Sequence, residues 1–283
     1  MSFLKTIFRI SAQNFRKWQN DYRIWTIAVF LIIMTLIYVD DIKKVSCIIG
    51  SRVPVWIFPF LYSQFYTKVL FTIPVVLMFC DAPFVDKNQL FILTRTTRTK
   101  WLCGQILYII SASGVYYLFI FAVSILSTVF YGDFSLEWGK TLTALAYNSS
   151  VASEADVYSL SVSRIVVEYF TPLSACFYTF ILSWLSAVFL GLLTFVCNLF
   201  TGSRILGIAA SCFFIVISLS AKGIRNMDRL SPVTWSTLDG VDVGGVTLRP
   251  SFGYCMSMYT VLIVGLAALV FIFGRKKSLD VKG

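Results

Sequence analysis

Residues 172–198, PLSACFYTFILSWLSAVFLGLLTFVCN, contain no Lys, Arg, Asp or Glu, over a length greater than the roughly 20 residues that a helix needs to cross a bilayer. Five further stretches are strongly apolar, and Lys68 is the one charged residue among them. The chain of 283 residues is 58% hydrophobic and only 13% charged, too few charges to cover the surface of a soluble domain. We therefore predict an all-α polytopic membrane protein with six transmembrane helices. The predicted spans are 24–39, 58–80, 104–130, 172–198, 205–221 and 257–274.

Six spans place both termini on one side of the membrane. The segments on that side would be 1–23, 81–103, 199–204 and 275–283. They carry 14 of the 24 Lys and Arg residues but 4 of the 14 Asp and Glu residues, so the whole net charge of +10 lies there. The positive-inside rule then predicts that both termini are cytosolic. The same charge suits anionic membrane lipid, so no nucleic-acid partner is expected.

No linker divides the chain, so we expect a single transmembrane domain over 1–283. Its outer parts would be a loop over 131–171 and a Gly/Pro-rich segment over 222–256. Within the first of these, LEWGKTLTALAY (136–147) is expected to form a surface helix that dips Trp138 and Leu142 towards lipid. The other parts are, in chain order, 1–23, 24–130 with its cytosolic loop 81–103, 172–221 and 257–283.

Residues 3–23 have the periodicity of an amphipathic helix lying along the membrane. At about 100° per residue, aromatic and aliphatic side chains fall on one face and most basic side chains on the other. This pattern is typical of an interfacial helix, and the alternative is a solvated basic tail. The apolar face holds Leu4, Ile7, Phe8, Phe15, Trp18 and Tyr22, and the basic face holds Lys5, Arg9, Arg16 and Arg23. We expect Lys5, Arg9, Phe15, Arg16 and Trp18 to hold the helix at the surface.

Residues that carry chemistry are few. The chain has no histidine, which excludes His-based triads and His acid–base chemistry. It has no GxxxxGK[ST] motif, so it cannot hydrolyse ATP by a P-loop mechanism on its own. No acid lies in a predicted span, which argues against an acidic proton relay. We therefore expect that this chain is not an enzyme, with no catalytic residue, metal site or cofactor of its own.

The seven cysteines have no CxxC spacing and mostly fall in or beside predicted spans. They are therefore interpreted as small buried apolar residues rather than a disulfide or metal framework. Cys47 and Cys255 are both expected outside and could pair.

The loop 81–103, DAPFVDKNQLFILTRTTRTKWLC, places the apolar run LFIL (90–93) among basic and hydroxyl side chains. This pattern predicts a short helix over about 88–101 that presses on the membrane and offers its polar groups to the cytosol. The alternative is a loop that only sets topology, although such a loop would not need the apolar run. The residues expected to dock on a partner are Gln89, Arg95, Arg98, Lys100 and Trp101.

Lys68 falls near the middle of the second predicted span, and Gln64 lies one helical turn before it. A lysine at that depth costs about 2.5–3.5 kcal/mol on insertion scales and usually faces protein or a water-filled path. The alternative is a span that begins later, with Lys68 reaching outward, although 69–80 alone is too short to cross. The residues expected to line a translocation path are Tyr62, Gln64, Tyr66 and Lys68.

The layout as a whole resembles the type 2 permeases of ATP-binding-cassette exporters. The shared features are an N-terminal amphipathic helix, six spans, a basic amphipathic loop between spans two and three, and a structured outer segment before the last span. Locally, FILTR (91–95), followed by RTKW (98–101) and GQ (104–105), is similar to that loop in permeases of Gram-positive bacteria. The outer loop 131–171 is longer than the usual connection in that family.

The resemblance implies a coupling helix that sits in a groove of a separate cytosolic P-loop ATPase. Two copies of the ATPase would bind ATP and Mg²⁺, and a second permease chain, identical or related, would complete the complex in a bacterial plasma membrane. We therefore expect an export permease that moves an amphipathic cargo such as a peptide, an antibiotic or a lipid-like molecule. The alternative is a non-transporting sensor or immunity protein that binds a ligand through its outer loops.

Overall fold

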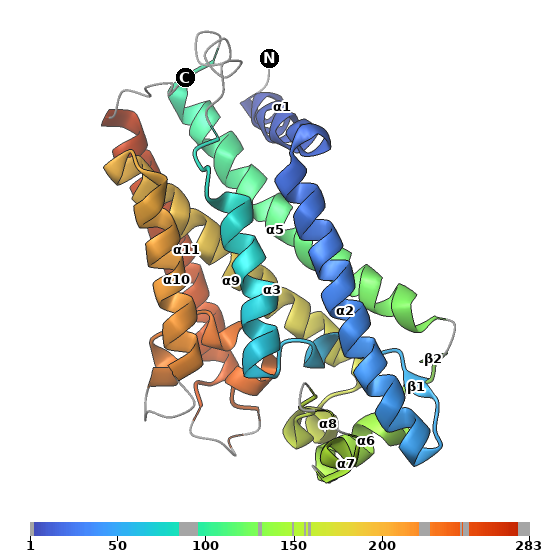
Figure 1. Cartoon of the computed structure of the whole chain (residues 1–283). Helices are drawn as coiled ribbons and strands as arrows, with labels where there is room; N and C mark the ends of the chain where they lie inside the picture. The colour runs from blue at the N-terminus through green and yellow to red at the C-terminus, as the bar shows by residue number, and fades with distance from the viewer. Residues whose placement is uncertain are drawn as a thin grey trace.

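The computed structural model is a bundle of long α-helices (Figure 1). It describes residues 3–84, 96–129, 132–148, 150–155, 157, 160–220, 227–243, 245 and 249–276. Each of the six predicted spans falls on one helix. These helices are α2 (Tyr22–Ile49), α3 (Phe65–Phe79), α5 (Arg98–Thr128), α9 (Pro172–Thr201), α10 (Arg204–Ser220) and α11 (Phe252–Lys276).

Among the described residues, four helices are long and apolar enough to cross a membrane: α2, α5, α9 and α11. The helices α3 and α10 are apolar but shorter. The protein is thus all-α, with the helices of a multi-pass membrane protein. Crossing by the two shorter helices stays a prediction.

The helix α2 runs further than the sequence predicted, because the segment after residue 39 keeps a helical spacing of buried side chains. Ile42 and Val45 are buried one and two turns after Val39. Lys44 pairs with Asp40 and Asp41 on the exposed side at 3.4 and 3.1 Å. Gly50 then ends the helix with φ 67°, a conformation that glycine adopts without strain. The helix therefore continues for ten residues past the predicted span end at residue 39.

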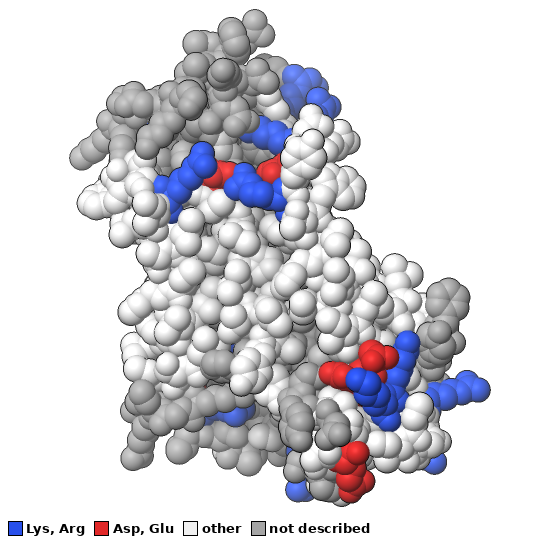
Figure 2. Space-filling view, in the orientation of Figure 1, with Lys and Arg blue, Asp and Glu red and all other residues white. Residues whose placement is uncertain are grey.

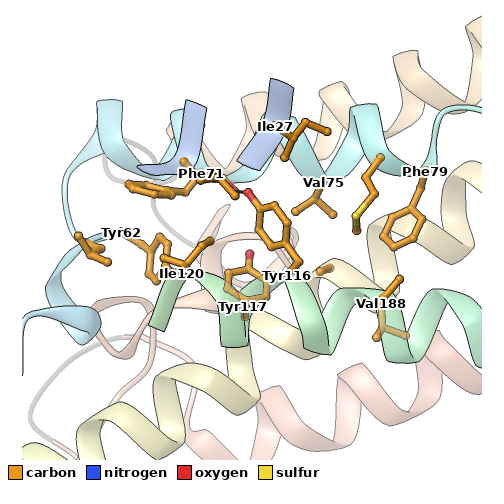
Figure 3. Packing of buried hydrophobic residues seen from close by; sticks show 14 of the residues in the cluster. Ile27, Tyr62, Phe71, Val75, Phe79, Tyr116, Tyr117, Ile120 and Val188 are labelled. Atoms are coloured by element: carbon orange, nitrogen blue, oxygen red, sulfur yellow. Dashed lines mark hydrogen bonds between the residues drawn. The ribbon is translucent and has the colours of Figure 1, made fainter. Parts of the chain in front are cut away.

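The central helix is α9, which contacts α3, α5, α10 and α11. Its Gly191 allows a close approach, since a Cβ there would lie 2.7 Å from Ile109 Cγ2 on α5 and 2.9 Å from Phe79 Cδ2 on α3. Beside it, aromatic and aliphatic side chains from α3 and α5 face one another (Figure 3). The Tyr116 hydroxyl donates to the Phe71 carbonyl at 2.7 Å, which satisfies a polar group inside this apolar cluster.

The N-terminal helix α1 spans Phe3–Arg16 and packs on the first turns of α5. Figure 1 shows it at the end of the bundle where α11 finishes. A 3₁₀ turn, η1 (Lys17–Asn20), separates α1 from α2, so the predicted continuous helix over 3–23 is broken. The Asn14 side chain donates to Gln105 Oε1 at 2.8 Å, and Trp18 Nε1 donates to the Tyr108 hydroxyl at 2.7 Å.

The predicted apolar face of α1 is only partly buried. Ile7 and Ile10 are buried against the bundle, whereas Leu4 and Phe8 are 65% and 62% exposed. Phe15 and Trp18 are half-buried, and the basic residues Lys5, Arg9 and Arg16 are exposed. The helix therefore keeps an outward apolar patch beside its basic residues, and its placement in the membrane interface stays a prediction.

The opposite end of the molecule holds the short elements (Figure 1). A parallel pair of two-residue strands joins the segment after α2 to the segment after α5, with Val53 opposite Gly132. The short elements are β1 (Val53–Pro54), η2 (Phe58–Phe60), β2 (Gly132–Asp133), α6 (Gly139–Tyr147), α7 (Ser150–Glu154), α8 (Arg164–Tyr169), η4 (Met227–Arg229), η5 (Thr234–Ser236) and η6 (Leu238–Gly240).

The helix predicted within 136–147 exists as α6, but it does not dip towards lipid. Trp138 is 7% exposed and Leu142 is fully buried. The Trp138 ring lies 5.2 Å from Phe60, and its Nε1 donates to the Phe170 carbonyl at 2.8 Å. Both side chains therefore hold the outer segment to the bundle.

All seven cysteines are free thiols. Cys47 is exposed on α2, and Cys255 is buried on α11. The pairing that the sequence left open is not formed.

The close packing of α1 on α5 predicts that one small substitution lowers stability. A Cβ at Gly104 would lie 2.6 and 2.7 Å from Ile10 Cγ2 and Cβ, so Gly104→Ala must push α1 away. Overpacking of this kind costs about 1–3 kcal/mol. We expect a lower unfolding temperature in detergent and faster tryptic cleavage within α1.

The matched control is Gly265→Ala on α11, where a Cβ would meet no atom within 4 Å. It should leave the unfolding temperature unchanged or raise it slightly, because alanine favours helix over glycine. Equal unfolding temperatures and equal tryptic cleavage of the two variants would contradict the close packing of α1 on α5.

Candidate functional site

Charged side chains gather at two ends of the molecule. Figure 2 shows a broad belt between them that carries almost no charge on the visible face. One end includes α1, the start of α2 and the turn after α3. The other includes α6, α8 and the last turns of α2 (Figure 1). This distribution suits a hydrocarbon layer around the belt, since charges at that depth are costly.

At the first end, one carboxylate links three helices. Asp81 directly follows α3, and its Oδ2 pairs with the guanidinium of Arg23 at the start of α2. Its Oδ1 lies 2.8 Å from Arg204 Nη1, at the first residue of α10. The Asp81 side chain is 19% exposed, whereas the two arginines are 50% and 72% exposed. These two ion pairs therefore join the segment after α3 to the start of α2 and to the start of α10.

The side-chain amide of Asn198, on α9, also binds this turn. Asn198 Nδ2 donates to the carbonyls of Cys80 and Ala82 at 2.9 and 2.8 Å. Asn198 is 4% exposed, so these bonds are shielded from solvent. Gly207 on α10 leaves room for the amide, because a Cβ there would lie 2.2 Å from Asn198 Oδ1.

The last residue of the turn, Phe84, reaches the N-terminal helix region and α5. Lys17 Nζ donates to the Phe84 carbonyl at 3.2 Å. The Phe84 ring lies 5.0 Å from Tyr108, which accepts the hydrogen bond from Trp18. The segment Cys80–Phe84, here called the α3 turn, thus contacts side chains from η1, α2, α5, α9 and α10. The chain passes from it directly into the predicted coupling segment.

Of the five predicted docking residues, three lie in the described part of the chain and two do not. Gln89 and Arg95 lie outside the described residues. Arg98 and Lys100 are half-buried in the first turn of α5, and Lys100 Nζ lies 6.0 Å from the centre of the Phe3 ring. Trp101 is fully buried, so it anchors α5 instead of presenting its ring to a partner. Thr96 and Thr97 are not helical, and residues 98–101 form the first turn of α5. The prediction of one unbroken helix over 88–101 was therefore wrong at 96–97, and the part over 88–95 lies outside the described residues.

Lys68 does not lie in the middle of a span. The helix α3 begins at Phe65, after the 3₁₀ turn η2, so Lys68 is in its first turn. Its Nζ donates to the Thr234 carbonyl at 3.1 Å. Tyr62 is buried against Phe71 and Tyr117, whereas Tyr66 is 71% exposed and Gln64 precedes the helix. These four residues do not share one surface in this conformation.

A small polar cavity of about 40 Å³ lies beside Lys68 at the N-terminal end of α3. It is large enough to hold water. Within the described part of the chain, Ser218 Oγ, Thr234 Oγ1 and Asp239 Oδ1 are buried there without a hydrogen-bond partner. Buried polar atoms of this kind are usually satisfied by water. The cavity therefore accounts for a charged lysine that is shielded from lipid.

The end of the molecule opposite α1 also carries an open cleft of about 970 Å³, between the end of α2, β1 and α6. Arg52, Glu137 and Lys140 line it, together with Tyr147. Beside the cleft, Arg164 Nε and the Tyr147 hydroxyl both donate to Glu168 Oε1, at 2.6 and 2.9 Å. These hydrogen bonds, that of Arg164 first, lower the pKa of Glu168.

The described residues hold no group of three or more His, Cys, Asp or Glu side chains that could bind a metal ion. The residues that build the α3 turn contacts were not predicted as a site. Asn198 had the clearest signal, because it is the only amide side chain in the uncharged stretch 172–198. No local sequence pattern indicated the ion pairs of Asp81, since its two partners are 58 and 123 positions away in the chain.

Comparisons with protein-family models, with curated proteins and with solved structures find no match to this chain.

The α3 turn predicts a stability difference between two acidic residues. Asp81→Asn removes the charge that both arginines share. Because the arginines are 50% and 72% exposed, each ion pair is expected to contribute at most about 1 kcal/mol, and the variant loses two such pairs. We expect the unfolding temperature in detergent to fall by several degrees, and the fall to shrink in high salt. Asp40→Asn is the control, because Asp40 is 63% exposed and pairs with Lys44 at 3.4 Å. A drop of the same size in both variants would contradict a special role for Asp81.

Proposed function

We propose that the chain is the membrane-spanning permease subunit of an ATP-driven exporter whose ATPase is a separate cytosolic P-loop protein. In this proposal α3 and α10 also cross the membrane, both termini face the cytosol, and two permease chains pair. ATP and Mg²⁺ are bound by the two ATPase copies. The cargo is amphipathic, and the membrane is a bacterial plasma membrane.

The α3 turn carries the proposal. A partner that pushes on the segment after residue 84 would push on a turn held by side chains of α2, α9 and α10. The ion pairs of Asp81 link the second predicted span to the first and the fifth. Rigid contacts of this kind are the physical means by which force at one surface moves several helices together. A loop that only sets topology needs none of them.

Two further observations support the same end of the molecule as the docking face. The segment before the first predicted span has five basic residues and one acid, and α1 lies at the end that the α3 turn occupies. Polar bonds from Asn14 and Trp18 join α1 and η1 to α5. A partner that contacts both α1 and the 85–95 segment would therefore transmit force to α5 through each of them.

The predicted spans hold no Asp, Glu or His, and Lys68 is their one charged residue, so no acidic or histidine relay is available to drive transport instead. Lys68 is at the N-terminal end of α3, where it donates to the Thr234 carbonyl beside a small polar cavity. The energy for transport would then come through the cytosolic face. The wall of the cargo path would form between two permease chains.

The outer cleft favours the second candidate, a sensor or immunity protein that binds a ligand outside. Its volume of about 970 Å³ is at the upper end of the roughly 300–1,000 Å³ of small-molecule sites. Arg52 and Lys140 would favour an anionic group. In that case no ATPase would be needed.

The proposal predicts a partner in native membranes. Tagged protein extracted in mild detergent should co-purify with a stoichiometric P-loop ATPase, identified by mass spectrometry. The double variant Arg95→Glu/Arg98→Glu should lose it, because both charges are reversed in the docking segment. Arg52→Glu/Lys140→Glu reverses two charges in the outer cleft and should retain it.

Recovery of the folded chain without an ATPase would sink the exporter proposal and favour the ligand-binding alternative. An ATPase that is retained equally by both double variants would contradict docking through residues 95 and 98.

A further inference from the structure

An apolar groove of about 250 Å³ runs along the membrane-facing side of α2 at the basic end of the molecule. Its walls are α2 from Ile24 to Leu31 and α5 from Val115 to Phe119, with Met78 of α3 between them. Trp18 and Trp25 stand at its mouth. Tryptophan is typical of the boundary between headgroups and hydrocarbon, so the mouth lies at the level of an interface.

The length of the groove matches part of one leaflet. From Ile24 to Leu31 an α-helix rises about 10 Å, at 1.5 Å for each residue. A leaflet is about half of the roughly 30 Å hydrocarbon core, so the groove reaches about two thirds of the way to the midplane. An acyl chain that enters beside Trp25 would run in the same direction as its neighbours in the bilayer.

The side chains that line the groove are almost all apolar, which suits a hydrocarbon chain. A single hydrocarbon chain about 4–5 Å across, as carbon contact distances give, would displace roughly 150–200 Å³ over a length of about 10 Å. The observed volume of about 250 Å³ suits one chain.

A polar pocket continues the groove at its mouth. The pocket of about 90 Å³ shares Trp18, Ile24 and Met78 with the groove, and Lys17 and Arg23 line it. Two acids, Asp21 and Asp81, also line it. Arg23 pairs with both acids, and Arg204 also pairs with Asp81. Lys17, Arg23 and Arg204 therefore carry one charge more than Asp21 and Asp81.

We propose that this groove and pocket bind one acidic membrane phospholipid. One acyl chain occupies the groove against Ala28, Met78 and Phe119. The phosphate lies at the mouth near Lys17 and Arg23, where anionic headgroups are attracted by clustered basic residues. The lipid would then touch α2, α3 and α5 next to the α3 turn, and this placement is independent of whether an ATPase docks there.

The test counts lipids that the purified protein retains. The full chain is purified in mild detergent with equal amounts of phosphatidylglycerol and phosphatidylcholine that carry the same acyl chains, and is then measured by native mass spectrometry. We expect one phosphatidylglycerol per chain, retained at least fivefold over phosphatidylcholine. Ala28→Trp fills the groove and should cut the retained phosphatidylglycerol at least fivefold.

Val29→Trp is the control, because Val29 is the next residue along α2, is 54% exposed and does not line the groove. It should retain phosphatidylglycerol as the unmodified chain does. Lys17→Gln and, separately, Arg16→Gln should lower the preference for phosphatidylglycerol while leaving phosphatidylcholine retention unchanged. The unfolding temperatures of all variants establish that each is folded.

Unchanged phosphatidylglycerol retention in a folded Ala28→Trp would overturn the proposal. So would equal retention of the two lipids by the unmodified chain. Dimers that Ala28→Trp abolishes, without any retained lipid, would assign the groove to a second copy instead.

Discussion

A hydrocarbon layer offers no hydrogen-bond partner, and this constraint explains where the polar groups of the chain lie. Hydroxyl side chains on the long helices return to their own backbone, as when Thr35 donates to the Leu31 carbonyl at 2.8 Å and Ser113 to the Ile109 carbonyl at 2.8 Å. Polar bonds between helices are made by buried groups such as Tyr116. Charged groups that could not be satisfied in this way lie at the two ends, outside the uncharged belt.

The same constraint makes the basic end the place where helices can be tied by charge. Asp81 is partly buried and shared by arginines of two helices, and Asn198 covers the carbonyls of the same turn. Hydrogen bonds between ionised groups are shorter and stronger than those between neutral groups. The α3 turn is thus a rigid junction at the point where the chain enters its basic segment, and the proposed lipid would bind beside it.

Much of the architecture could be predicted, because an uncharged stretch such as 172–198 has one stable solution in a bilayer. Helix ends were harder. The last turns of α2 contain Asp40, Asp41 and Lys44 and lie beyond the predicted span, although their buried positions continue the helix to Ile49. Residues 58–64 are as apolar as a span but fold as a 3₁₀ turn and irregular chain, which places Lys68 in the first turn of α3. The contacts of Asp81 and Asn198 join residues far apart in sequence, and no local pattern encodes them.

The central claim is that the basic segment after the α3 turn docks on an ATPase, and crosslinking in native membranes tests it most directly. Phe91 is replaced by the photoreactive residue benzoylphenylalanine, with Phe134, which is 56% exposed near the outer end, replaced in the same way as the control. After irradiation, we predict an adduct between position 91 and a P-loop ATPase, and none from position 134. A position-91 residue that captures only lipid, or a different class of protein, would contradict the account.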